Sequence, residues 1–312
     1  MSYEKLNTFG KTRTPFLFIS DFKGEKLEVF PLDQLDENDI EFNIEENYIL
    51  KKHPHKIDKI EIPFSDYQKK FDRVIKKIES GETYILNLTQ ETKIKTTLNL
   101  KEIYSIANAH YKLRFKDKFV CFSPEKFIQI EGTTIHTFPM KGTIDATLSN
   151  ANMRLLEDKK EMAEHIMIVD LLRNDLSMVS NSVAVIDFRY ITRVQAGVKD
   201  LLQVSSHITG SLDENWHEHI GDILKALLPA GSISGAPKKS TLKIIDDIES
   251  YDRGFFSGVF GVYNGNTLDS GVMIRFIEKK DTGFVYKSGG GITLDSDPYL
   301  EYQELLEKIY LP

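Results

Sequence analysis

The segment FVCFSPEKFIQIEGTTIHTF, residues 119–138, decides the fold class of this 312-residue chain. It holds two runs of strand-forming residues, 119–122 and 127–131, and a third at 134–138 that follows the tight-turn residue Gly132. Helical spacing does not occur between these runs, so we expect neighbouring strands to pair antiparallel. The segment therefore favours an α+β fold over a parallel sheet built from βαβ units.

The rest of the chain is consistent with this class. We expect an N-terminal hairpin from strands at 16–18 and 27–31, and a polar connector over 36–59. Apolar spacing predicts helices over 64–79, 100–111, 152–179, 216–228, 239–250 and 298–309, and strands over 82–95, 183–194, 201–209, 258–263, 267–278 and 284–288. The whole chain is interpreted as a single domain, 1–312.

Composition excludes several classes of protein. The 40 Lys and Arg residues and 47 Asp and Glu residues give a formal charge of −7, which argues against a nucleic-acid or membrane surface as the main partner. Cys121 is the single cysteine, so no disulfide can form within the chain. Charged residues interrupt the N-terminal segment and no long apolar run follows, so we expect a cytoplasmic protein.

Two predicted helices carry paired carboxylates. Glu161 and Glu164 are three residues apart, as are Glu301 and Glu304, so each pair shares a helical face. If both faces pointed into one cleft, their oxygen atoms would suit Mg²⁺. Spacing alone equally fits two solvated helix faces, which are more common.

Glycine-rich segments and one lysine are further candidates. Residues 231–238, GSISGAPK, and 288–291, SGGG, offer backbone amides that could bind a carboxylate or phosphate, although both also fit tight turns. Lys141 lies between a methionine and a glycine in PMKGT; a desolvated lysine is a usable nucleophile, whereas most lysines are solvated. Glu125 could serve as a general acid if burial raises its pKa.

Taken together, these segments resemble the chorismate-utilising enzymes, which include anthranilate synthase component I, aminodeoxychorismate synthase component I, and the isochorismate and salicylate synthases. The resemblance rests on motifs in the family's order from about residue 78 onward: Asn87-Leu88, SPEKF from Ser123, PMKGT from Pro139, KEMAEHIMIVDLLRNDL from Lys160, GSISGAPK from Gly231, RGFFSG from Arg253, MIRF from Met273 and SGGGITLDSDPYLEYQE from Ser288. It implies two packed antiparallel β-sheets flanked by outer helices, with a shortened N-terminal part at about 1–60.

Within this family, three positions bear on the reaction. Members that add water have a lysine where this chain has Ile85, which disfavours water as the nucleophile. Anthranilate synthases usually have alanine where this chain has Lys141, and aminodeoxychorismate synthases have lysine. The resemblance therefore implies an aminodeoxychorismate synthase component I that serves 4-aminobenzoate and folate synthesis. Gln203 and Phe256 depart from the family's usual His and Tyr, and anthranilate synthesis or binding without catalysis remain the alternatives.

The resemblance also implies a role for each matching residue. Lys141 would be the nucleophile and Glu125 the acid, and Arg275 would hold the enolpyruvyl carboxylate. Glu164 and Glu304 would bind Mg²⁺ with support from Glu161 and Glu301, and the carboxylate sites would be lined by Gly142, Thr143, Gly289, Gly291 and Lys308. The implied partners are chorismate, ammonia and a separate glutamine amidotransferase subunit.

Overall fold

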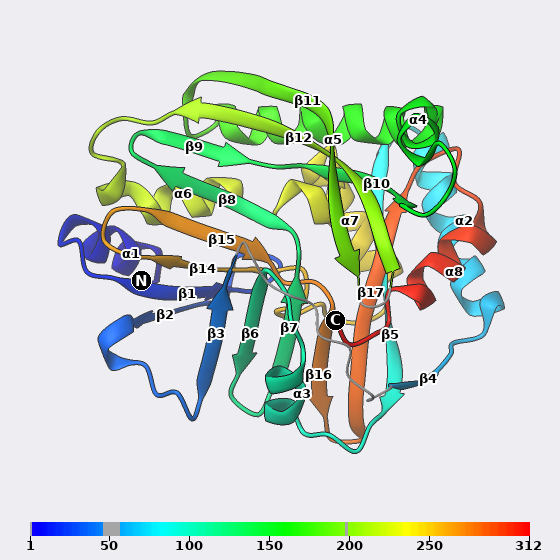
Figure 1. Cartoon of the computed structure of the whole chain (residues 1–312), viewed down its shortest axis with the longest axis horizontal. Coiled ribbons are helices and arrows are strands. Elements are labelled where there is room, and N and C mark those ends of the chain that lie inside the picture. The colour runs from blue at the N-terminus through cyan, green and yellow to red at the C-terminus, as the bar shows by residue number, and fades with distance from the viewer. Residues whose placement is uncertain (1, 46–56, 197–198) are drawn as a thin grey trace. The chain divides into compact units, whose positions relative to one another are not determined.

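The computed structural model describes residues 2–45, 57–196 and 199–312. The chain folds into two compact units, and each unit is assembled from three separate segments. The first unit consists of Met1–Asp36, Glu125–Ser232 and Arg253–Val272, and the second of Glu37–Pro124, Ile233–Asp252 and Met273–Pro312. Figure 1 shows how the segments that form each sheet are spread over the sequence.

An antiparallel sheet forms the centre of the first unit. Within the described residues its nine strands are β1 (Phe16–Ser20), β2 (Leu27–Pro31), β8 (Lys126–Glu131), β9 (Thr134–Thr137), β10 (Met140–Asp145), β11 (Asn181–Ala196), β12 (Lys199–Ser211), β14 (Val259–Tyr263) and β15 (Leu268–Val272). The spatial order is β10-β12-β9-β8-β15-β14-β1-β2, and β11 also pairs with β12. Strand β1 is buried along its whole length, so this part of the sheet lies in the core.

Helices cover this first sheet. They are α1 (Ser2–Lys11), α4 (Ala151–Glu157), α5 (Lys159–Ser177) and α6 (Ile220–Leu227), with the short 3₁₀ turns η1 (Leu32–Gln34) and η2 (Trp216–His219). Helix α5 packs on β10, β11 and β12 (Figure 1). Asp158 caps α5, because its side chain accepts a hydrogen bond from the backbone N–H of Glu161. This cap fixes where the helix that carries Glu161 and Glu164 begins.

The second unit is built on another antiparallel sheet. Within the described residues its eight strands are β3 (Ile40–Ile44), β4 (Asp58–Ile60), β5 (Ile85–Lys95), β6 (Tyr111–Phe115), β7 (Phe119–Ser123), β13 (Gly235–Ala236), β16 (Phe276–Lys280) and β17 (Gly283–Ile292). The order is β13-β5-β17-β16-β7-β6-β3, and β4 also pairs with β5. The long pair of β5 and β17 brings the glycine-rich segment 288–291 opposite residues 87–90.

The helices of the second unit are α2 (Phe64–Glu79), α3 (Leu100–Ile106), α7 (Lys238–Ile248) and α8 (Pro298–Glu307); a 3₁₀ turn, η3 (Gly231–Ile233), precedes β13. Asp297 caps α8 by accepting from the N–H groups of Tyr299 and Leu300, and Pro298 occupies the first turn. Helices α2 and α8 pack on each other and on β17. Helix α8 is thereby held over the glycine-rich part of β17.

The predicted α+β class with antiparallel sheets is confirmed, as are the N-terminal hairpin and the helix over 64–79. Other expectations were wrong. The expected connector over 36–59 contains β3 and β4, while 46–56 lie outside the described residues, and the N-terminal residues form a helix, α1, that was not predicted. The single helix expected over 152–179 is two helices, because Asp158 leaves helical geometry to cap α5.

The single strand expected over 267–278 is also two strands, β15 and β16, which belong to different sheets. Arg275 has a left-handed φ of 50° at this break, and a strand cannot continue through that conformation. In contrast, the glycine-rich segment 288–291, which fitted a tight turn, continues β17 to Ile292. Cys121 is fully buried, and burial raises the pKa of its thiol.

Candidate functional site

Lys141 lies on β10 at a bulge. The register between β10 and β12 shifts between Met140 and Thr143, so Lys141 and Gly142 fall at the irregular part of the strand pair. Gly142 has a φ of 86°, and a Cβ atom there would lie 3.3 Å from Glu161 Oε2. The bulge therefore requires glycine, and it brings Lys141 and Gly142 against the acidic face of α5.

Glu164 is the buried carboxylate at this point. Its exposed fraction is 7%. Lys141 Nζ lies 3.9 Å from Glu164 Oε2, and Lys160 Nζ lies 3.8 Å from Glu164 Oε1. Two cations thus offset a carboxylate that would be costly to bury alone. The predicted residues Lys141, Gly142, Glu161 and Glu164 form one cluster, and Lys160 joins it through its i,i+4 spacing.

His165 is a buried residue that the sequence interpretation left without a role. The apolar Ile166 beside it is 48% exposed, whereas His165 is fully buried. Burial and the positive charges of Arg189 and Lys141 lower the pKa of His165 to about 4. The only sequence feature that pointed to His165 was its position next to Glu164. That position fits a solvated histidine as well as a buried one.

Glu125 and Ser232 join two of the motifs. Glu125 immediately precedes β8, and the Ser232 hydroxyl of GSISGAPK donates a hydrogen bond to its carboxylate Oε1. The carbonyl of Glu125 accepts from the N–H of Val272, which holds its backbone at the end of β15. Thr143 is exposed on β10 and lies directly opposite Gln203 of β12. Gln203, where the family usually has histidine, therefore lies next to Thr143, a predicted substrate-binding residue.

In the second unit, Gly290 faces the acidic pair of α8. A Cβ atom at Gly290 would lie 3.3 Å from Glu301 Oε2, 3.9 Å from Glu304 Oε1 and 3.8 Å from Lys308 Nζ. Lys308 Nζ donates to the carbonyl of Gly289 at 2.8 Å and lies 2.7 Å from Glu304 Oε1. The structure therefore brings together four predicted residues of the second unit, Gly289, Glu301, Glu304 and Lys308. Gly290, which was not predicted, belongs to the same group. Because side chains alternate along a strand, Gly290 faces the opposite side of β17 from Gly289.

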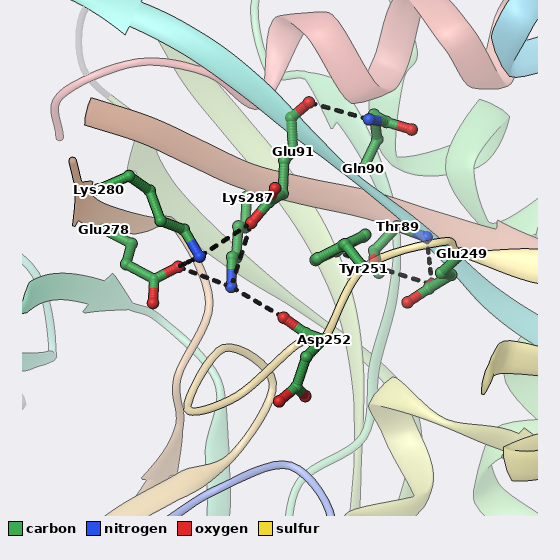
Figure 2. Close-up of polar contacts among 9 residues, drawn as sticks. All are labelled: Thr89, Gln90, Glu91, Glu249, Tyr251, Asp252, Glu278, Lys280 and Lys287. Carbon is green, nitrogen blue, oxygen red and sulfur yellow. Dashed lines mark hydrogen bonds and ion pairs between the residues drawn. The ribbon is translucent and has the colours of Figure 1, made fainter. Parts of the chain in front are cut away.

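Strand β5 supports the glycine segment from the other side. Gly289 lies opposite Thr89, and a Cβ atom at Gly289 would lie 2.7 Å from Thr89 Cγ2 and 2.4 Å from the carbonyl oxygen of Leu88. Thr89 is anchored in turn by Glu249, whose Oε1 accepts from the Thr89 N–H at 2.7 Å and its hydroxyl at 2.8 Å (Figure 2). A buried carboxylate thus fixes the strand that Gly289 contacts.

Two residues before Gly289, a buried ion cluster holds β17 to its neighbours. Figure 2 shows Lys287 between Glu278 of β16 and Glu91 of β5. Lys287 Nζ lies 2.9 Å from Glu278 Oε2 and 3.5 Å from Glu91 Oε1, and Lys280 Nζ contacts the same two oxygens at 2.9 and 3.5 Å. The two lysines balance the two glutamates, so the cluster is neutral.

The remaining predicted residues lie at strand ends or along the strand pair. Arg275 stands between β15 and β16, and its guanidinium carbon lies 5.2 Å from the centre of the Tyr310 ring. Gly291 pairs with Asn87 in the ladder of β5 and β17. Ile85 and Phe256, which depart from the family pattern, are each 2% exposed.

The acidic pairs fit Mg²⁺ in donor type. Glu164 and Glu301 are 7% and 5% exposed, so one carboxylate of each pair is largely dehydrated, whereas the Glu304 side chain is 56% exposed. Each pair faces a glycine and contacts a lysine, Lys141 in the first unit and Lys308 in the second. Across residues 2–45, 57–196 and 199–312, no cluster of three or more His, Cys, Asp or Glu side chains is arranged to hold a metal ion.

Comparison with known proteins places this geometry in context. The family model described as chorismate binding enzyme matches residues 26–311. A PabA-like protein of Haemophilus influenzae, itself uncharacterised, is 49% identical over 99% of this chain and 95% of its own length. Anthranilate synthase component 1 of Acetivibrio thermocellus is 34% identical over 74% of this chain, and aminodeoxychorismate synthase component 1 of Bacillus subtilis is 30% identical over 80%.

The chain spans about half the length of the last two relatives, 49% and 55%. Among solved structures, anthranilate synthase component I of Streptococcus pneumoniae superposes with a TM-score of 0.67 at 26% identity, over 84% of this chain and 60% of its own. The menaquinone-specific isochorismate synthase of Escherichia coli shares the fold, with a TM-score of 0.67 at 18% identity over 83% of this chain and 63% of its own. None of the described helices has the length and apolar character needed to span a membrane.

Proposed function

This chain belongs to the family of chorismate-binding enzymes, and from that premise we propose that it converts chorismate and ammonia to 4-amino-4-deoxychorismate. The product would serve 4-aminobenzoate and folate synthesis. The observation that carries the proposal is Lys141, placed on a glycine-dependent bulge with its Nζ 3.9 Å from the buried Glu164.

The position of Lys141 supports a covalent route. Its side chain is 22% exposed, so Nζ is accessible to a ligand while Glu164 restricts its direction. In its neutral form the amine attacks C2 of chorismate, the ring double bond shifts, and the C4 hydroxyl leaves as water after protonation by Glu125. Ammonia then adds at C4, the double bond shifts back and Lys141 leaves. Two easier displacements replace one difficult displacement.

The hydrogen bond between Ser232 and Glu125 supports the role of Glu125 as the acid. Ser232 donates to Oε1, so it fixes one oxygen of the carboxyl group. The other oxygen can then carry the proton that the leaving hydroxyl takes. This assignment couples the GSISGAPK motif to the chemistry through orientation of the acid.

Substrate recognition is assigned to the charged and glycine-rich groups. Arg275 would form paired hydrogen bonds with the enolpyruvyl carboxylate. The remaining groups that would line the carboxylate sites are Gly142, Thr143, Gly289, Gly291 and Lys308. Mg²⁺, held by Glu164 and Glu304 with Glu161 and Glu301 in support, would neutralise the ring carboxylate when bound.

Ammonia would come from a separate glutamine amidotransferase subunit, and free ammonia would replace it in vitro. The test is therefore to incubate the purified chain with chorismate, Mg²⁺ and an ammonium salt and to identify the product by chromatography. Formation of aminodeoxychorismate supports the proposal.

Anthranilate synthesis is the second candidate, because an anthranilate synthase component is 34% identical to this chain. The same incubation separates the two, since anthranilate is fluorescent and aminodeoxychorismate is a distinct product. Chorismate binding without turnover, measured by calorimetry, would indicate a protein that has lost catalysis. Either result would contradict the proposed amination at C4.

A further inference from the structure

His165 is a buried polar side chain that the proposed reaction does not use. It follows Glu164 on α5 and is fully buried. Its Nε2 lies 2.6 Å from the hydroxyl oxygen of Ser206 on β12. Its Nδ1 is buried as well and has no hydrogen-bond partner among the described residues. A buried polar atom without a partner destabilises the folded chain, so its retention requires a reason.

The hydrogen bonds of Ser206 assign the tautomer of His165. Ser206 Oγ accepts from the backbone N–H of Arg189 at 3.0 Å. Its single O–H can then donate to His165 Nε2, which makes Nε2 the acceptor. With Nε2 as the acceptor from Ser206, the ring proton lies on Nδ1. The unpartnered atom is therefore an N–H donor.

The backbone of Lys141 lies next to this donor. Helix α5 packs on β10, and the Lys141 backbone lies close enough to the ring to raise the pKa of His165 as an acceptor does, although no bond of hydrogen-bond geometry within the described residues reaches Nδ1. Lys141 and Gly142 fall where the register of β10 against β12 shifts, so the ladder does not fix their peptide groups. Ser206 donates its own N–H to the carbonyl of Pro139 at 3.0 Å, and this bond ties β12 to the residue before β10.

We propose that His165 is a positioning residue for Lys141, whose carbonyl accepts a hydrogen bond from the Nδ1–H of His165 in the substrate complex. Helix α5 then holds Lys141 at two points, through Glu164 at the ammonium group and through His165 at the backbone. This inference rests on the proposed role of Lys141 as nucleophile. The bulge allows the backbone at Lys141 more than one conformation, and the hydrogen bond from His165 stabilises one of them.

Two substitutions separate the ring nitrogens of His165. His165→Asn keeps an N–H close to the Nδ1 position, whereas His165→Gln places its amide near Nε2 and loses that donor. We expect His165→Gln to lower kcat about 100-fold with KM for chorismate changed less than about twofold, and His165→Asn to retain kcat within about tenfold. His219→Gln, at an exposed histidine of η2, is the matched control and should change neither constant.

A second readout does not depend on turnover. The rate at which an amine-reactive ester acylates Lys141, measured by mass spectrometry, is divided by the rate for Lys160 in the same sample. Lys160 is the internal reference because it contacts the same carboxylate, Glu164, at 3.8 Å. We expect the ratio to change in His165→Gln and to stay at the wild-type value in His165→Asn.

The outcomes distinguish this inference from the proposed function. A wild-type chain that forms no aminodeoxychorismate overturns the proposed function, while the acylation ratio still tests the positioning. The same ratio in wild type and both variants overturns the positioning, as does a parallel loss of kcat and of the urea midpoint in both variants. If His165→Gln does not fold, Ser206→Ala removes the group that fixes the ring and should change the ratio in its place.

Discussion

At the scale of single residues, Lys141 is the side chain on which the proposed chemistry depends. Lys141→Ala should lower aminodeoxychorismate formation at least about 1,000-fold, because the covalent route is lost. The urea midpoint should hardly change, since the side chain is 22% exposed and its ion pair with Glu164 is long, at 3.9 Å. Product formation and urea unfolding, measured on the same preparation, check both parts.

The matched control is Lys160→Ala, which removes the other lysine at the same carboxylate. It should leave the product unchanged and lower the rate by less than about tenfold, because Lys160 has no covalent role. Equal losses in the two variants would mean that positive charge beside Glu164, and not the nucleophile, is what Lys141 supplies.

His217 makes a prediction about pH and stability. It is 8% exposed, stacks on Trp216 and lies 2.7 Å from the hydroxyl oxygen of Tyr263. Burial, and to a smaller extent the charge of Arg13, lowers the pKa of His217 from 6.5 to about 4. The unfolded chain therefore binds this proton first, so the stability present above pH 6.5 is lost as pH falls from about 6.5 to about 4.

The measurement is the urea midpoint at a series of pH values for wild type and His217→Phe. The variant should show a shallower decrease over that range, with some slope left because the pKa of His165 is lowered to about 4 as well. His219→Gln, at an exposed position, should keep the wild-type slope. If the slope of His217→Phe equalled that of wild type, His217 would not be the titrating group.

The sequence supplied Lys141 and Glu164 but not His165. Helical spacing is compatible with more than one buried face, and here the apolar Ile166 is exposed while the polar His165 next to it is buried. The tautomer of His165 depends on Ser206, which is 41 residues away on β12. A contact of that kind has no signal in local spacing.

At the scale of elements, the break between α4 and α5 is a cap that the sequence contained. Asp158 accepts from the N–H of Glu161 at 3.0 Å and begins the helix that carries the first acidic pair. The apolar spacing continues across the break, and it predicted one helix over 152–179. Asp158→Ala should lower the free energy of unfolding by about 1 kcal/mol, and Asp158→Asn should restore most of it.

Urea unfolding of the two Asp158 variants measures this difference. Asn accepts the same hydrogen bond without the charge, so it isolates the cap from the helix dipole. Equal unfolding free energies for Asp158→Ala and wild type would contradict the role of Asp158 as the cap.

The Lys287 cluster shows how β17 is held among its neighbours (Figure 2). The Lys287 side chain is 1% exposed and also donates to the carbonyl of Asp252 at 3.3 Å. Lys287→Met should lower the free energy of unfolding by about 1–3 kcal/mol, because Glu91 and Glu278 would keep only Lys280 as a counter-charge. Lys280→Met is the control: its side chain is 41% exposed, so it should cost less than about 1 kcal/mol.

Thermal or urea unfolding of Lys287→Met and Lys280→Met shows which variant loses more free energy of unfolding. A larger loss for Lys280→Met than for Lys287→Met would contradict the buried lysine as the main counter-charge. The cluster itself could not be predicted, because its members come from three strands that are adjacent only after the sheet forms.

At the scale of the whole molecule, each unit takes three segments of the chain in turn. The sequence predicted antiparallel sheets, since strands follow one another without crossover helices, but it could not assign strands to sheets. Strands β15 and β16 are neighbours in sequence and lie in different sheets, whereas β1 pairs with β14 although most of the chain separates them. Local sequence patterns therefore predict whether strands pair antiparallel better than they predict which strands pair with each other.

The two acidic pairs belong to different units, Glu161 and Glu164 to the first, Glu301 and Glu304 to the second. Glu164→Gln and Glu304→Gln should each raise the Mg²⁺ concentration that gives half-maximal activity, because each removes a charged oxygen ligand from its own pair. Unchanged Mg²⁺ dependence in one of the variants would remove that pair from the metal assignment.

Activity measured against Mg²⁺ concentration, after dialysis with a chelator, gives both losses. Dialysis should abolish activity and added Mg²⁺ should restore it, since the proposed role of the ion is to neutralise the ring carboxylate of the substrate. Glu157→Gln, at the residue that ends α4, is the matched control and should leave the Mg²⁺ requirement unchanged. Full activity in the presence of the chelator would contradict the metal assignment while leaving the covalent role of Lys141 open to its own test.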